Sequence, residues 1–177
     1  MNLLTRTLTI ALLSLAASMA VAAPTPFKTT FDELLSEFPN FEAEIKPVPP
    51  TSEGKQRRAG AVVLGNGLLM MEAEGATMDA LEEFTVGYTI TGATTAQERQ
   101  QLDDLSYSFI RKLARSDKGY WQTKAYFTED LTRQFTVLKA GGTPKPNRKV
   151  FGNTELRVRL VKGDGDLTVL YLFKRLG

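Results

Sequence analysis

Two segments at the carboxyl end of the chain constrain its fold most strongly. In residues 155–162 and 167–174, apolar side chains recur at alternate positions, and the two segments flank the turn sequence Gly-Asp-Gly-Asp at 163–166. Asp-Gly is a strong signal for a β-hairpin, because Gly adopts positive φ without strain. A two-residue turn at Asp164-Gly165 places six apolar side chains on one face, as the opposed pairs Leu160 with Val169, Val158 with Tyr171, and Leu156 with Phe173.

Other patterns predict two helices. Thr30 and Glu33 have the spacing of a capping box, and an apolar stripe follows it at Phe31, Leu34, Leu35 and Phe38. This predicts a short helix near the amino end, which we expect to pack on its own domain. A second capping box at Thr95 and Glu98 precedes a longer stripe, which predicts a long helix with the apolar residues Leu102, Leu105, Phe109, Ile110 and Leu113.

Further strands are expected between and after these helices. Asn66-Gly67 predicts a hairpin in which the opposed pairs are Leu64 with Leu69, Val63 with Met70, and Val62 with Met71. Both faces of this hairpin are apolar near the turn, so we expect it to be covered on both sides or buried against another surface. Residues 83–91 alternate with period two, as a half-buried strand does, and residues 120–127 and 133–139 are two shorter strand candidates.

These elements predict an α+β fold. We expect a mainly antiparallel sheet of about five to seven strands, with one long helix packed on a face and a short N-terminal helix. The expected organisation is a signal peptide at 1–23, a short helix and Pro-rich linker at 24–58, and a globular domain at 59–177. Within the linker, residues 46–58 hold three prolines and few apolar residues, which is typical of a linker or an exposed loop.

The amino end has the three parts of a secretory signal. A weakly basic start with Arg6 leads into a short apolar run, which closes on small residues before Pro24. The run is shorter than the roughly 20 residues that cross a bilayer, which argues against a membrane anchor. We therefore expect a periplasmic or secreted protein that does not span the membrane after cleavage.

The second face of the C-terminal hairpin mixes cations with apolar side chains. Its opposed pairs are Arg159 with Leu170, Arg157 with Leu172, and Glu155 with Lys174. One interpretation is structural: the long helix covers this face, the leucines are buried, and the arginine stems reach outward or pair with helix acids. The other is a binding face for an anionic or protein partner, with the candidate residues Arg157, Arg159, Leu170, Leu172 and Lys174.

Charge divides the chain into unlike halves. Residues 24–104 carry 14 acids and 6 bases, and residues 105–177 carry 6 acids and 15 bases, so their net charges are −8 and +9. The two halves either interleave their charges in one domain or leave a basic patch for an anionic partner. The small net charge of the whole chain and the lack of a recognised motif argue against a nucleic-acid partner.

Composition excludes several classes of enzyme. The chain has no His and no Cys, so it cannot hold a Ser-His-Asp triad, a Cys nucleophile or a zinc finger. No cofactor motif occurs, and we expect no cofactor or metal; Asp164 and Asp166 suit a turn better than a calcium loop. Carboxylate-based hydrolysis stays open, because it needs only acids, of which the chain offers Glu72, Glu74, Glu82, Glu83, Asp103 and Asp104.

The sequence thus favours a non-catalytic binding or accessory protein of the bacterial cell envelope. Its expected partner is an envelope protein or an anionic envelope component, contacted through the cationic and apolar face of the C-terminal hairpin. The alternative is a carboxylate-based hydrolase of envelope glycans.

Overall fold

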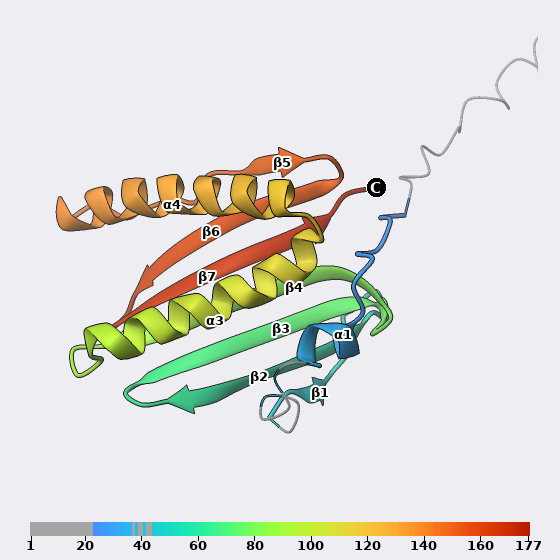
Figure 1. Cartoon of the computed structure of the whole chain (residues 1–177), viewed down its shortest axis with the longest axis horizontal. Helices are drawn as coiled ribbons and strands as arrows, with labels where there is room; N and C mark the ends of the chain where they lie inside the picture. Colours follow the sequence, from blue (N-terminus) through green and yellow to red (C-terminus); the bar gives the residue numbers. More distant parts are fainter. Residues whose placement is uncertain (1–22, 37, 39–40, 42–43) are drawn as a thin grey trace, which may run out of the picture.

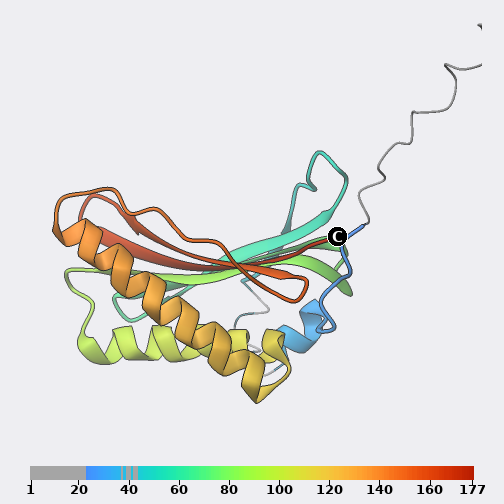
Figure 2. The ribbon, with the colours of Figure 1, turned by 90° about the horizontal axis from the view of Figure 1, so that it is seen from above.

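A seven-stranded antiparallel sheet forms the body of the protein. The computed structural model describes residues 23–36, 38, 41 and 44–177, and in these residues the strand order is β1-β2-β3-β4-β7-β6-β5. Helices α1, α3 and α4 lie on one face of this sheet, as Figure 1 and Figure 2 show. The α+β class predicted from the sequence is confirmed. Most of the predicted signal peptide, residues 1–22, lies outside the described residues.

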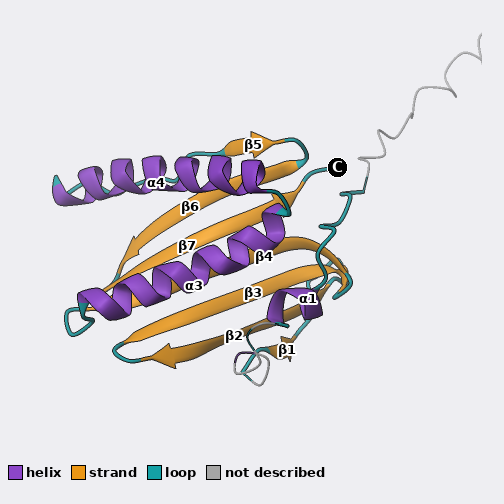
Figure 3. Ribbon diagram, in the orientation of Figure 1, coloured by secondary structure: helices purple, strands orange, loops and turns teal. Residues whose placement is uncertain are grey.

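The elements follow one another as a short helix, four strands, two long helices and three strands (Figure 3). Their bounds are α1 Phe31–Leu35, β1 Lys46–Val48, β2 Gln56–Leu64, β3 Gly67–Thr77, β4 Ala80–Thr91, α3 Ala96–Ala114, α4 Asp117–Lys139, β5 Lys149–Phe151, β6 Thr154–Lys162 and β7 Asp166–Arg175. The segment 46–58, expected to be a linker or an exposed loop, contains β1 and the first residues of β2.

The β6–β7 hairpin has the register that its sequence predicts. Leu156, Val158 and Leu160 pair with Phe173, Tyr171 and Val169, and all six side chains are buried toward the helices. Gly165 has φ of 90° in the turn, as the Asp-Gly signal requires. Strand β4 lies beside β7 and adds Phe84, Val86, Tyr88 and Ile90 to the same buried face, as its alternation predicts.

The turn between β2 and β3 lies one residue earlier than predicted, and the pairing register differs by two residues. Leu64 pairs with Gly67 and not with Leu69, so the loop is Gly65-Asn66. Gly65 has φ of 58°, while Asn66 is not among the residues with positive φ. A glycine at the first central position suits a type II′ turn, which is as compatible with a two-residue hairpin as the expected Asn-Gly turn. The carboxylate of Glu98 fixes this turn by accepting the Asn66 backbone N–H at 3.0 Å.

Both predicted capping boxes are present. Thr30 caps α1 and Thr95 caps α3. Each threonine side chain accepts a hydrogen bond from the backbone N–H of the glutamate three residues later, and the carboxylate of that glutamate accepts one from the backbone N–H of the threonine. Helix α1 buries Phe31, Leu34 and Leu35 completely or nearly so. It packs on α3 within the same domain, as expected for a terminal amphipathic helix.

The two strands predicted for residues 120–127 and 133–139 are wrong. Both segments belong to helix α4, which begins after the N-cap Ser116 and runs for 23 residues. Its buried side chains have helical spacing of three or four, at Tyr120, Thr123, Phe127, Asp130 and Gln134. The protein therefore has a second long helix beside α3. The core lies between these two helices and the sheet, with Phe127 packed against Tyr171 and Phe173.

No helix in the described part of the chain combines the length and the apolar character needed to cross a membrane.

Candidate functional site

The sheet has one face that carries no described helix. We call this the open face (Figure 2). Because side chains alternate across a strand, each strand contributes every second residue to it. The side chains of the C-terminal hairpin that point away from the core, including Arg157, Arg159, Leu170 and Leu172, all lie there. The structural interpretation, in which the long helix covers these residues, is wrong, because α3 and α4 pack on the opposite face of the sheet (Figure 2).

Registers across five strands arrange the open face in rows. One row is charged and consists of Arg57, Glu74, Glu83, Lys174 and Glu155. The next two rows cross the middle of the sheet and contain Ala59, Glu72, Thr85, Leu172 and Arg157, then Ala61, Met70, Gly87, Leu170 and Arg159. The last row is Val63, Leu68, Thr89, Thr168 and Val161. Charge is therefore concentrated at one end of the face.

The remaining area is largely apolar. We define the open-face patch as Ala61, Val63, Leu68, Met70, Val161, Leu170 and Leu172. Each of these side chains is half-buried or exposed, and Val63 reaches 72% exposure and Val161 41%. In the last row, between Leu68 and Val161, the hydroxyls of Thr89 and Thr168 are hydrogen-bonded to each other at 2.8 Å. Hydrophobic side chains that share one surface, with charges at its margin, resemble the core and rim of a protein interface.

Ion pairs neutralise most cations of the open face. Arg157 donates to Glu155 at 2.6 Å, and Lys174 pairs with Glu83. Burial tends to raise the pKa of Glu155, but hydrogen bonds from Arg148 and Arg157 outweigh it and hold that pKa below its usual value. Arg159 is exposed and has no hydrogen-bond or ion-pair partner among the residues that the structure describes. The face thus carries one unpaired cation at the edge of its apolar patch.

The structure brings together all five residues that the sequence singled out. Arg157 and Arg159 on β6 lie opposite Leu172 and Leu170 on β7, as predicted, and Lys174 lies opposite Glu155. The pairing of Lys174 with Glu83 also joins the basic half of the chain to the acidic half, so these charges interleave as the simpler interpretation of the charge asymmetry expects.

The sequence did not assign strands β2 and β3 to the same site. Their contribution to the patch is Ala61, Val63, Leu68 and Met70. A signal was present, since both faces of this hairpin are apolar and only one can pack against the helices. What the sequence did not show is that β4 and β7 are neighbours, which joins the two hairpins into one surface.

Two acids on the open face form a like-charged pair. Glu74 on β3 is directly opposite Glu83 on β4. Burial raises the pKa of Glu74, and the nearby charge of Glu83 adds to this effect, while Lys55 and Arg57 oppose it. Glu83 also lines a cavity of about 240 Å³ together with Glu155 and Arg157. Glu74 is not among the residues that line this cavity, so the pair meets only part of what a carboxylate-based hydrolase needs.

A separate acid, Asp103, belongs to helix α3 and points toward the sheet. The carboxylate of Asp103 accepts hydrogen bonds from the hydroxyls of Tyr171 at 3.0 Å and Tyr88 at 3.3 Å. Burial raises the pKa of Asp103, and the two tyrosine hydrogen bonds act against that shift. The group faces the core between α3 and the sheet, away from the open face, so it belongs to the internal packing of the domain.

The described residues contain no cluster of three or more acids that could hold a metal ion. Asp164 lies in the β6–β7 turn and Asp166 is the first residue of β7, where its carbonyl accepts the Gly163 N–H at 3.1 Å.

No family model, no curated protein and no solved structure matches this chain, so its function must be inferred from the arrangement of its own residues.

Proposed function

We propose that the protein is an exported, non-catalytic binding module of the bacterial cell envelope, and that the open face is its contact surface. The observation that carries this proposal is the open-face patch, an apolar area on four strands of a sheet whose other face is packed against helices. Export rests on the signal pattern of residues 1–23. Burial of these exposed apolar side chains by a partner contributes favourably to the free energy of binding.

Charge distribution favours a protein partner over an anionic polymer. A surface that binds a polyanion needs several unpaired cations, because attraction to each negative charge adds to affinity. On the open face Arg157 and Lys174 are already paired with Glu155 and Glu83. The unpaired Arg159 lies beside Leu170, which suits a partner with an apolar patch and a single acid at its edge.

Affinity capture with variants of the mature protein tests this proposal. The mature chain, immobilised and exposed to an extract of its native envelope, should retain a protein identified by mass spectrometry. Arg159→Glu and Leu170→Asn should each reduce its capture by about tenfold, because one reverses the free charge and the other removes apolar contact. Circular dichroism checks that both variants fold.

Arg99→Glu is the matched control, since Arg99 is an exposed arginine on α3, away from the open face. This variant should retain the partner. Undiminished capture by Arg159→Glu and Leu170→Asn, with their folds intact, would remove the open face as the contact surface. If only a second copy of the chain is captured, and size-exclusion chromatography shows a dimer, the proposal that the open face binds a different protein is contradicted.

The competing hypothesis, a carboxylate-based hydrolase of envelope glycans, is favoured by one observation. Glu74 has a raised pKa and lies opposite Glu83, and a glycosidase needs one protonated acid near a second carboxylate. Release of reducing sugar ends from purified envelope glycan measures this directly. Turnover by the mature chain that Glu74→Gln abolishes would establish the hydrolase; our proposal expects no turnover by either protein.

A further inference from the structure

A cavity of about 410 Å³ opens at the end of the domain where α3 meets α4. It lies on the helix side of the sheet and is independent of the open face. Its walls come from the N-terminal segment, the α3–α4 junction, the first turns of α4, and strands β5, β6 and β7. Its volume falls in the range of sites that hold small organic ligands.

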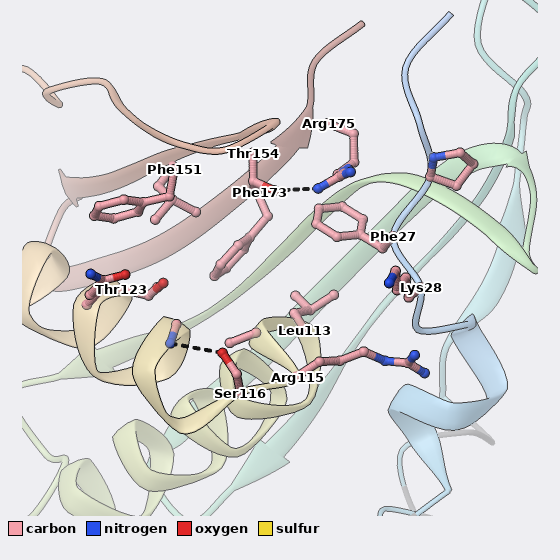
Figure 4. Close-up of a pocket in the computed structure, with 15 residues that line it drawn as sticks. Phe27, Lys28, Leu113, Arg115, Ser116, Thr123, Phe151, Thr154, Phe173 and Arg175 are labelled. Carbon is pink, nitrogen blue, oxygen red and sulfur yellow. Dashed lines mark hydrogen bonds between the residues drawn. The ribbon is translucent and has the colours of Figure 1, made fainter.

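The cavity is apolar on its inner side. Phe27, Leu113, Phe151 and Phe173 line it, and Figure 4 shows their side chains around a common space. Phe27, Leu113 and Phe173 belong to the buried core, so they form a fixed wall. Such a wall favours a hydrocarbon group, since contact with it removes apolar surface from water.

Cations gather along one side of this cavity. Lys28, Arg115 and Arg175 lie on the side of the N-terminal segment in Figure 4, and no Asp or Glu is among the described residues that line the space. Arg115 is partly neutralised by Glu33 at 3.2 Å. Neither Lys28 nor Arg175 has a carboxylate partner in the described part of the chain. The lining therefore carries an uncompensated positive charge.

Arg175 is held in place by neutral groups. Its Nε donates to the Thr25 carbonyl at 2.6 Å, and one terminal nitrogen donates to the Thr154 hydroxyl at 2.8 Å. The guanidinium lies over the ring of Phe27, 5.5 Å from its centroid. These contacts fix the guanidinium without cancelling its charge. The other terminal nitrogen remains a donor for an anion, and a fixed donor loses less entropy when it binds.

We propose that this cavity binds a fatty-acid carboxylate of medium chain length. Its hydrocarbon chain lies among the four apolar side chains, and its carboxylate pairs with Arg175 and Lys28. The N-cap Ser116 and the first turns of α4, with Gly119 and Gln122, also line the cavity, and this helix end adds a favourable dipole for the negative head. Neither the cations alone nor the apolar wall alone selects this ligand; their adjacency does.

Isothermal titration of the mature protein with sodium decanoate, below its micelle concentration, tests the proposal. Decanoate should bind saturably with one site. Decyltrimethylammonium and acetate should each bind at least about tenfold more weakly, since one reverses the charge of the head and the other lacks the tail. Equal affinity for decanoate and decyltrimethylammonium would overturn the assignment, and so would the absence of saturable binding.

Two variants locate the site. Gln122→Glu adds an acid to the lining at an exposed position of α4, so the fold should survive while decanoate affinity falls by about tenfold through like-charge repulsion. Lys28→Glu should have the same effect. Gln101→Glu is the matched control, because Gln101 holds the same place relative to the start of α3 and lies outside the cavity.

The control should bind decanoate as the unchanged chain does. Undiminished binding by both Gln122→Glu and Lys28→Glu would show that decanoate binds elsewhere and would refute the site. Capture of a protein by the open face does not enter this measurement, so either proposal can fail alone.

Discussion

The side-chain oxygen of Gln134 accepts the backbone N–H of Leu160 at 3.0 Å, so a helix side chain completes the hydrogen bonding of strand β6. The amide nitrogen of Gln134 donates to the Val158 carbonyl and to Asp130, both at 2.8 Å. Strand β5 covers only the first part of β6, as Lys149 pairs with Leu156. Gln134 thus supplies hydrogen-bond partners to the backbone of β6 beyond the end of β5, where a neighbouring strand would otherwise be needed.

Gln134→Ala should lower the free energy of unfolding by about 3 kcal/mol, because it leaves a buried N–H and a buried C=O without partners. Urea denaturation followed by circular dichroism measures this change. Gln122→Ala, an exposed change of the same type on the same helix, should cost less than about 0.5 kcal/mol. Equal stability of the two variants would show that Gln134 does not support β6.

The free energy of unfolding of the Asp103→Asn variant, relative to that of the unchanged chain, should increase as pH rises. The folded state raises the pKa of Asp103 above its usual value of about 3.8, mainly through burial, so it binds this proton more tightly than the unfolded chain. The resulting stabilisation is fully present below about pH 3.8 and is lost as pH rises through the raised pKa. The nearby charge of Asp104 adds to this rise. Burial also raises the pKa of the neighbouring Tyr88, Tyr107 and Tyr171, so these hydroxyls do not titrate in the acidic range.

Asparagine keeps the acceptor for the two tyrosine hydroxyls and does not titrate. The difference in unfolding free energy between Asp103→Asn and the unchanged chain should therefore increase from pH 3.5 to pH 7, measured by urea denaturation at several pH values. Asp79→Asn, in an exposed turn, provides the control for a general charge effect. A difference that is constant or decreases with pH would contradict this description of Asp103.

Gly87→Ala should destabilise the sheet by about 2 kcal/mol. A Cβ at Gly87 would lie 2.1 Å from the Val169 carbonyl oxygen and 2.9 Å from the Leu170 Cα, so the backbone of β7 would have to move. At Gly92 an added Cβ meets nothing within 4 Å, and Gly92→Ala should change stability by less than about 0.5 kcal/mol. Differential scanning calorimetry compares the two; equal melting temperatures would mean that β4 and β7 are not so closely packed.

Local patterns predicted the elements that have strict periods and matching end signals. The β6–β7 hairpin combines alternation with a Gly that has positive φ, and α3 combines a capping box with an apolar stripe. In each case the turn or cap and the packing favour the same structure. The five candidate binding residues were predicted for this reason, since the face of a side chain follows from register.

Helix α4 was missed because three positions of its buried stripe, Thr123, Asp130 and Gln134, are polar. Asp130 and Gln134 continue the spacing set by Tyr120, Thr123 and Phe127, but they are buried through hydrogen bonds and not through hydrophobicity. Aromatic and β-branched residues in the segment then favoured strands. The full extent of the open-face patch could not be predicted for a different reason: it depends on which strands are neighbours, and that is decided by packing between distant segments.

Site-specific photocrosslinking in the native cell tests the contact surface most directly. p-Benzoylphenylalanine at Val63 or Leu170 places the probe on the open-face patch, and the same probe at Trp121, 57% exposed on α4, places it on the helix side. Our account predicts a covalent adduct with the same envelope protein from positions 63 and 170, and none from position 121. Adducts of equal yield from all three positions, or an adduct from position 121 alone, would contradict it.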